Sequence, residues 1–223
     1  MKGYLFDTHV HTKESSSCGC VPAAEIVERY KNLGYDGIII TDHVHASQFS
    51  KNGSTYEEQA LKHLEGYRTA KALETENFRV IYGMEIRFLE NDNDYLLYGF
   101  DDDFIFSRDM AHFETLEEFR TVVEENNLIL FQAHPFRCNM TVIDQTLIDG
   151  IEVYNGHGGH NSSNDIAYHW AQKYSHRMLS GSDFHGNVKM EPGGVYFEEY
   201  PENSKDVARL LREGKYSLKI YTK

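Results

Sequence analysis

Cysteine and positive charge are scarce in this sequence, and each shortage argues against a class of protein. The three cysteines, Cys18, Cys20 and Cys138, are too few and odd in number to form a disulfide framework, which is typical of a reducing compartment. Lysine and arginine total 22 against 35 aspartates and glutamates, so the net charge is −13 at pH 7. This charge opposes a surface that follows a nucleic-acid backbone, and we expect no extended nucleic-acid surface.

Long apolar runs and a secretory signal are absent as well. No apolar run approaches the roughly 20 residues that a transmembrane helix requires. The first residues, MKGYLFDTHVHT, contain a short apolar stretch broken by Asp7 and no small-residue cleavage site. We therefore predict a cytoplasmic protein with no membrane partner. The sequence contains no signal for an oligomeric state.

Linkers, repeats and low-complexity tracts are missing too, because the four prolines and 17 glycines are scattered through the chain. Hydrophobic residues make up 40% of the sequence, which is enough to build a buried core. We therefore expect residues 1–223 to form one domain.

Short apolar runs suited to buried strands alternate with amphipathic helical patterns. The predicted strands are Tyr4–Phe6, Gly37–Thr41, Phe78–Phe88, Tyr95–Phe100, Leu128–Gln132, Gly150–Tyr154, Met178–Ser180 and Val195–Tyr200. The predicted helices are Pro22–Asn32, Glu57–Glu76, Leu116–Asn126, Asn164–Tyr174 and Ser204–Gly214. This alternation indicates an α/β fold with a mainly parallel sheet, and seven or eight strands are enough to close a barrel. An open sheet is the alternative.

Histidines and carboxylates lie on or directly after five of these predicted strands. They are His9 and His11 after the first, His43 after the second, Glu85 within the third, His134 after the fifth, and Asp183 and His185 after the seventh. Reactive groups in α/β folds gather at the carboxyl ends of strands, and residues two apart on an extended strand point to the same face. Imidazoles and carboxylates are ligands shared by Zn²⁺, Mn²⁺ and Fe. The pattern predicts a metal-dependent hydrolase.

The order of these motifs resembles the PHP (polymerase and histidinol phosphatase) domain family. The motifs are His-x-His, Thr-Asp-His, a strand glutamate, His-Pro and Ser-Asp-x-His, and the resemblance covers nearly the whole chain. It implies a distorted, TIM-like (β/α)7 barrel with two or three divalent metal ions, either Zn, Mn or Fe. It also implies hydrolysis of a small phosphorylated substrate of the histidinol phosphate, nucleotide or oligonucleotide type.

The resemblance also implies three sets of metal ligands. His9, His11, Glu85 and Asp183 hold one ion, Glu85 bridges to a second ion held by His134, and His43 and His185 hold a third. The family has a further ligand a few residues after His-x-His, usually histidine or aspartate, but this sequence has Glu14-Ser15-Ser16-Ser17-Cys18 there.

Two replacements for missing family ligands can be named. Cys18 is a candidate for the first, because a thiolate is a good zinc ligand, although Cys20 or Glu14 could serve and Cys18 could be inert. Near Tyr95–Phe100, where the family has another histidine, the candidates are Asp94 and Asp101.

Further residues are candidates for binding and catalysis. Arg137 is suited to clamp a phosphate, and the glycine-rich loop 155–161 offers Asn155 and His157 to an anionic substrate. Our hypothesis is that a water bridging two ions becomes the attacking hydroxide, with Asp183, His185 and His160 as catalytic residues. We further expect Asp42 and Asp7 to orient ligand imidazoles, or else to serve as turn residues.

Two other functions remain open. A barrel with His-x-His on its first strand also suits amidohydrolases, which cleave C–N bonds, but these often carry a carboxylated lysine that has no counterpart here. A metal-binding regulatory domain without activity is the other alternative. The presence of seven expected ligands favours catalysis.

Overall fold

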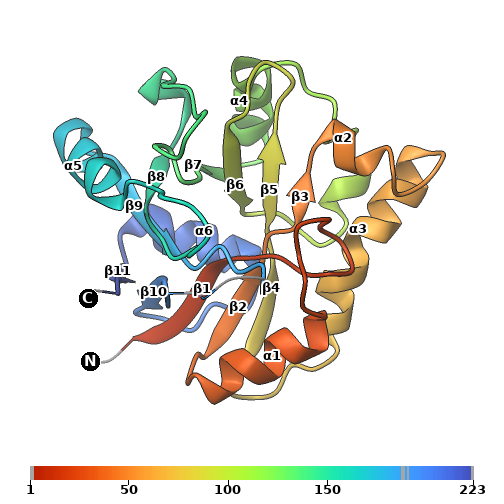
Figure 1. Cartoon of the computed structure of the whole chain (residues 1–223), viewed down its shortest axis with the longest axis horizontal. Coiled ribbons are helices and arrows are strands. Elements are labelled where there is room, and N and C mark those ends of the chain that lie inside the picture. The colour runs from red at the N-terminus through yellow and green to blue at the C-terminus, as the bar shows by residue number, and fades with distance from the viewer. Residues whose placement is uncertain (1–2, 187–188, 190, 222–223) are drawn as a thin grey trace.

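The computed structural model describes residues 3–186, 189 and 191–221, and Figure 1 shows their arrangement. Met1 and Lys2, which begin the segment inspected for a secretory signal, lie outside these residues. The strands are β1 (Tyr4–Val10), β2 (Gly37–Ile40), β3 (His43–Val44), β4 (Arg79–Tyr82), β5 (Met84–Arg87), β6 (Asp94–Tyr98), β7 (Ile129–Gln132), β8 (Gly150–Asn155), β9 (Arg177–Gly181), β10 (Gly194–Phe197) and β11 (Tyr216–Lys219). The helices are α1 (Ala23–Asn32), α2 (Ala46–Phe49), α3 (Tyr56–Lys71), α4 (Leu116–Glu125), α5 (Asn164–Tyr174) and α6 (Ser204–Glu213), with short 3-10 turns at Phe104–Phe106 and Gln145–Leu147.

The mixed α/β fold expected from the sequence is confirmed, and every predicted strand or helix overlaps an element of that type. The predicted strand Phe78–Phe88 is divided into β4 and β5 at Gly83, where an added Cβ would lie 3.0 Å from the side chains of Ile39 and Thr41. The sequence analysis missed β3, α2 and β11, which are short or partly exposed.

The strands form two sheets, with the orders β11-β10-β1-β2-β4 and β3-β5-β6-β7-β8-β9. The single closed barrel that we expected is therefore not found among the described strands. Pairing is parallel through β1-β2-β4 and β7-β8-β9, but β6 is antiparallel to both of its neighbours. The short turn between Arg87 and Asp94 explains this departure, because a parallel connection needs a crossover of a dozen or more residues.

One hydrophobic core is shared by both sheets. It contains Phe6, Ile39 and Ile81 from the first sheet, and Leu96, Phe131 and Leu179 from the second, all buried. Helices α1, α3, α4 and α5 lie around the strands in Figure 1, and a second core that includes residues of each of these helices covers the outer faces.

Helix α6 packs one apolar face onto the shared core. Asn203 accepts a hydrogen bond from the Asp206 backbone N–H at 3.0 Å, as an N-cap does, and Gly214 ends the helix with a φ of 69°. Val207, Leu210 and Leu211 are buried at helical spacing. None of the described helices has the length and apolar character needed to cross a bilayer.

The two sheets meet where β1 and β9 end. Val10 forms a parallel bridge with Phe184, and the His11 N–H donates to the Phe184 carbonyl at 3.0 Å. This pairing brings the residues after β1 beside the residues after β9, although they are far apart in the sequence.

Candidate metal centre

Two histidines and two carboxylates from three different strands meet at this junction. We call His9, His11, Glu85 and Asp183 the central group, and all four side chains are buried. His11 Nε2 lies 3.1 Å from Glu85 Oε2 and 3.3 Å from Asp183 Oδ1. His9 Nε2 lies 3.4 Å from a carboxylate oxygen of each acid. The ligand atoms expected to hold one ion are therefore brought together.

The electrostatics of the central group fit a cation. Burial alone would raise the pKa of Glu85 and Asp183, but the surrounding imidazoles hold both well below their usual values. Burial opposes a proton on His11, yet the carboxylates of Asp183 and Glu85 raise its pKa to about 9. Among the described residues, Glu85 Oε2 and Asp183 Oδ1 have no hydrogen-bond partner. Buried carboxylates with vacant lone pairs beside imidazoles are the donor set that Zn²⁺, Mn²⁺ or Fe²⁺ requires.

Glu85 is shared among four imidazoles. Its Oε1 lies 3.1 Å from His134 Nε2, and its Oε2 lies 2.9 Å from His43 Nδ1, in addition to the contacts with His9 and His11. This placement on β5, between three strand ends, is what a residue bridging two ions needs.

A second group consists of His134 and its neighbours Asp94, Arg87 and Arg137. Asp94 lies where the sequence analysis placed a candidate ligand, with its Oδ2 3.9 Å from His134 Nε2. However, Arg87 binds both oxygens of Asp94 at 2.8 Å, and Arg137 Nη2 contacts one of them at 3.2 Å. Asp101, the alternative, is exposed and paired with Lys205. Sequence analysis missed Arg87, which follows Glu85 by two strand positions and so shares its face.

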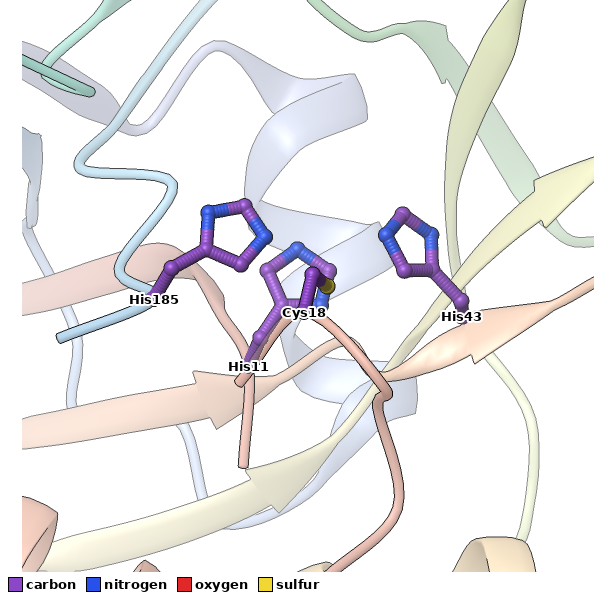
Figure 2. A group of neighbouring side chains, drawn as sticks. All are labelled: His11, Cys18, His43 and His185. Carbon is purple, nitrogen blue, oxygen red and sulfur yellow. The ribbon is translucent and has the colours of Figure 1, made fainter. Parts of the chain in front are cut away.

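A third group contains a cysteine. His11, Cys18, His43 and His185 each offer one ligand atom, and these atoms lie within 4.8 Å of one another. Figure 2 shows His11 and Cys18 between the rings of His43 and His185. Burial and the carboxylates of Glu85 and Asp183 raise the pKa of the Cys18 thiol above its usual value. Burial and His11 lower the pKa of His185 to about 2.

Glu14 and Cys20, the alternatives to Cys18 as a ligand, do not belong to this third group. The Glu14 carboxylate accepts hydrogen bonds from the Ala23 N–H at 3.0 and 3.1 Å, at the start of α1. The Cys20 side chain is exposed, and its thiol faces the Cys18 carbonyl at 3.6 Å.

Backbone strain accompanies two of the expected ligands. His134 has a φ of 29° and Asp183 has a φ of 51°, values that non-glycine residues rarely adopt and that cluster at functional sites. The His134 N–H donates to Glu152 Oε2 at 2.9 Å, which helps to hold this conformation.

Glu152 on β8 contacts His9 of the central group on the side of the ring that faces away from Glu85 and Asp183. It was not among the residues predicted from the sequence. Its Oε1 lies 3.0 Å from His9 Nδ1, so the other ring nitrogen of His9 faces Glu85 and Asp183. Outer carboxylates fix ligand imidazoles in this way. A sign of its importance was present in the sequence, since Glu152 is an acidic residue within the apolar run Gly150–Tyr154, a predicted buried strand.

Asn155 lies between two carboxylates of the site. It was predicted to bind substrate, but it is buried, and its amide donates to Glu152 Oε2 at 3.0 Å and to Asp183 Oδ2 at 3.1 Å. An amide donor between two carboxylates relieves their repulsion and fixes their positions. The structure thus shows Asn155 as a partner of Glu152 and Asp183, and its substrate-binding role stays a prediction.

Asp42 and Asp7 both accept hydrogen bonds from backbone N–H groups, which agrees with the turn role left open for them. Asp42 accepts from the Thr12 N–H at 2.7 Å and from Ser16 Oγ at 2.6 Å, and Ser16 Oγ in turn lies 3.3 Å from His11 Nδ1. Asp42 thus reaches an imidazole only through Ser16. Asp7 accepts from the His9 N–H at 3.1 Å, the Ser182 N–H at 3.0 Å and the Tyr30 hydroxyl at 2.8 Å, so it holds backbone segments and not an imidazole.

The three groups open into a pocket of about 290 Å³. Its walls are formed by Cys18, His43, Glu85, Arg87, Asp94, His134, Arg137, His157, His160, Asp183 and His185. The rings of His157 and His160 stack with centroids 4.3 Å apart, and His160 Nε2 lies 3.9 Å from Asp183 Oδ2. Burial and His157 lower the pKa of His160 to about 4, so this ring is neutral at pH 7. Arg137, His157 and His160 thus line the pocket, and the binding and catalytic roles expected for them stay predictions.

Comparisons with known proteins agree with this arrangement. The sequence matches the PHP domain family over residues 7–222. A comparison with curated proteins finds no match. A two-domain protein from Bacteroides vulgatus, described as containing a predicted PHP-like metal-dependent phosphoesterase, is 15% identical with a TM-score of 0.70. The alignment covers 98% of this chain and 65% of that protein, so the chain spans about two thirds of its length.

Two further solved structures have the same fold. PsfC from Pseudomonas syringae is 18% identical with a TM-score of 0.69, over 100% of this chain and 93% of that one. Endonuclease Q, in complex with a 27-mer duplex substrate that has an abasic lesion at the active site, is 15% identical with a TM-score of 0.58. That alignment covers 97% of this chain and 58% of that one.

The likeness to endonuclease Q corrects one expectation. We excluded an extended nucleic-acid surface because of the net charge of −13, but a protein of the same fold holds duplex DNA. The exclusion was wrong because net charge averages over the whole surface, whereas bound cations and local arginines set the potential at a site.

Proposed function

The chain belongs to the PHP domain family, and from this premise we propose that it is a metal-dependent phosphoesterase acting on a phosphate ester bound over the central group. The observation that carries the proposal is the pairing of a buried imidazole–carboxylate group with two arginines in one pocket. A cation site beside guanidinium groups is suited to a substrate with several negative oxygens.

The residues that would hold the ions are His9, His11, Glu85 and Asp183 of the central group, His134 of the second group, and Cys18, His43 and His185 of the third. Glu85 also contacts His134 and His43, so it adjoins both other groups. When bound, divalent ions supply Lewis acidity and lower the pKa of water toward neutrality. Zn²⁺, Mn²⁺ and Fe²⁺ all suit the nitrogen and oxygen donors of the central group.

Arginines and histidines of the pocket wall would bind the phosphoryl oxygens. Arg137 is 22% exposed, with Nη2 3.2 Å from Asp94 Oδ2 and Nη1 3.4 Å from His134 Nε2, so its guanidinium is held at the pocket wall, where it would meet an anion. The neutral His160 ring has a buried Nε2 without a partner among the described residues, and we assign it a hydrogen bond to the phosphoryl group or the leaving oxygen. Asn155 and Glu152 would keep Asp183 and His9 in place during the reaction.

The size of the pocket limits what enters it. A volume of about 290 Å³ is at the low end of ligand pockets, so it suits a phosphoryl group with part of its ester, while the rest of the substrate extends outward. Histidinol phosphate, nucleotides and nucleic acids all meet this requirement. Endonuclease Q adds duplex DNA to the substrates that deserve a test.

The direct test is hydrolysis by the metal-loaded protein. Wild type would be assayed with p-nitrophenyl phosphate, its diester, nucleoside monophosphates, histidinol phosphate and an abasic DNA duplex, with Mn²⁺ or Zn²⁺. Asp183→Asn should reduce kcat/KM by more than about 100-fold, the upper end of what losing an outer partner costs. Asp103→Asn is the matched control, because Asp103 is exposed and its side chain caps nothing.

Metal-dependent turnover that Asp183→Asn removes and Asp103→Asn retains would support the proposal. Bound ions without phosphate release from any substrate would contradict it, and would favour C–N bond hydrolysis or a regulatory metal site.

A further inference from the structure

The loop that carries Cys18 is fastened at both ends. The Lys13 N–H donates to the Val21 carbonyl at 3.1 Å, and the Ser16 N–H donates to the Thr12 carbonyl at 3.0 Å. The Cys20 N–H donates to the His185 carbonyl at 2.8 Å, which ties the loop to the segment after β9. Cys18 is therefore held beside His185 by backbone bonds and is not placed there by a free loop.

The imidazoles around Cys18 have unused ring nitrogens. Neither nitrogen of His185 has a hydrogen-bond partner among the described residues, and its side chain is only 10% exposed. Buried polar atoms are normally paired, so nitrogens left unpaired beside a thiol indicate a ligand. The His185 ring stacks on His11 with centroids 4.5 Å apart, and the His11 ring is equally close to that of His43.

The donors of this group differ in chemistry from those of the central group. The central group offers two carboxylates and two imidazoles, which hard and borderline ions both accept. Cys18, His43 and His185 offer one sulfur and two nitrogens, with His11 at the border of both groups. Thiolate ligands favour Zn²⁺, whereas Mn²⁺ and Mg²⁺ prefer oxygen.

We propose that Cys18, His43 and His185 form a sulfur-containing site that selects a thiophilic ion such as Zn²⁺, beside a central group that accepts Mn²⁺ as well. The chain would then hold two unlike ions, distinguished by their ligands. This inference rests on the proposed function only in requiring that the centre binds divalent ions.

Cobalt reports the sulfur ligand directly, without an activity assay. The metal-free full-length chain would be titrated with Co²⁺, and the absorption spectrum recorded. A thiolate bound to Co²⁺ produces an intense charge-transfer band in the near ultraviolet, which imidazole and carboxylate ligands do not. We expect this band in wild type and in Cys20→Ser and Cys138→Ser, because Cys20 and Cys138 are exposed.

Two variants of Cys18 separate ligation from folding. Cys18→Ser should lose the band and weaken the binding of about one zinc ion by roughly 100-fold or more, beyond the cost of an outer partner. Cys18→Asp should restore metal binding without the band and shift the preference of the site toward Mn²⁺. Circular dichroism of both metal-free variants shows whether the fold is kept.

Competition between Zn²⁺ and Mn²⁺ tests the selectivity of the sulfur-containing site. Wild type loaded with one equivalent of Zn²⁺ and then exposed to excess Mn²⁺ should retain both metals after gel filtration, and Cys18→Asp should retain less zinc and more manganese. A missing cobalt band in wild type, or unchanged zinc binding in Cys18→Ser, would overturn the inference. Hydrolysis without the band would refute the inference alone, whereas the band without hydrolysis of any phosphate ester would refute the proposed function alone.

Discussion

At the scale of single residues, Glu152 is the side chain whose role depends most on contacts distant in sequence. It orients His9, which lies 143 positions away, and it also accepts from His134 and Asn155. The contribution of a residue that acts through another should appear in metal affinity as well as in turnover.

We predict that Glu152→Gln weakens metal binding by about 10- to 100-fold, because an amide can no longer accept from His9 and Asn155 as a carboxylate does. Chelator competition measures the affinity. Glu125→Gln, at the exposed end of α4, is the control and should bind metal like wild type. Equal affinities in wild type and Glu152→Gln would refute the positioning role.

Arg137 gives a second prediction at this scale. Arg137→Ala should raise KM for a phosphate ester by roughly tenfold, since a charge-assisted contact contributes about 1.5–3 kcal/mol. Metal content should stay unchanged because His134 and Glu85 remain. Arg68→Ala, an exposed residue of α3, should leave KM unaltered. A loss of bound metal in Arg137→Ala with the same KM would assign Arg137 to the structure of the centre instead.

The expected ligands could be chosen from the sequence as side chains that lie close together, because His-x-His and Asp-x-His place neighbours on one strand face. The sequence analysis missed Glu152 and Arg87, whose partners come from other strands. It could not identify the partners of Asn155, Asp7 and Asp42, because the direction of a polar side chain at a strand end is decided by tertiary contacts.

At the scale of elements, α6 contributes buried side chains to the core that the two sheets share. Alternation of apolar and helical patterns predicted this helix and every other long one. The expectation of a mainly parallel sheet did not extend to β6, because the short segment between Arg87 and Asp94 leaves no room for the crossover that a parallel pair needs. Closure into a barrel could not be read from the sequence, because sheet curvature depends on pairing between distant strands.

We predict that Leu210→Ala on α6 lowers the free energy of unfolding by about 2–5 kcal/mol, because its fully buried side chain leaves a cavity in the shared core. Urea denaturation measures this change. Leu61→Ala on α3 is the control, since Leu61 is 43% exposed and should lose much less. Similar losses for both variants would mean that α6 does not support the core in this way.

At the scale of the whole molecule, net charge was the poorest guide. A charge of −13 led to the exclusion of nucleic acid, although this sum includes buried carboxylates such as Glu85 and Asp183, whose charge bound cations would neutralise. Fold class was predicted better, because it depends on periodic patterns along the entire chain.

We predict that divalent ions stabilise the whole chain. Binding at 100 times the dissociation constant contributes about 2.7 kcal/mol, which corresponds to a rise in Tm of roughly 5–10 °C. Calorimetry with and without a chelator measures this rise. A His9→Ala variant should show a smaller one, and an equal rise in both proteins would place the stabilising ions elsewhere.

The position of Glu85 among four imidazoles has a consequence for how the centre fills. Ions that share one carboxylate divide its charge, so each later ion binds more weakly than the one before it. We therefore expect occupancy to be graded and anticooperative, with separate steps in a calorimetric titration and not one sharp transition. The average number of ions bound to each molecule would then rise gradually over a broad range of free metal concentration.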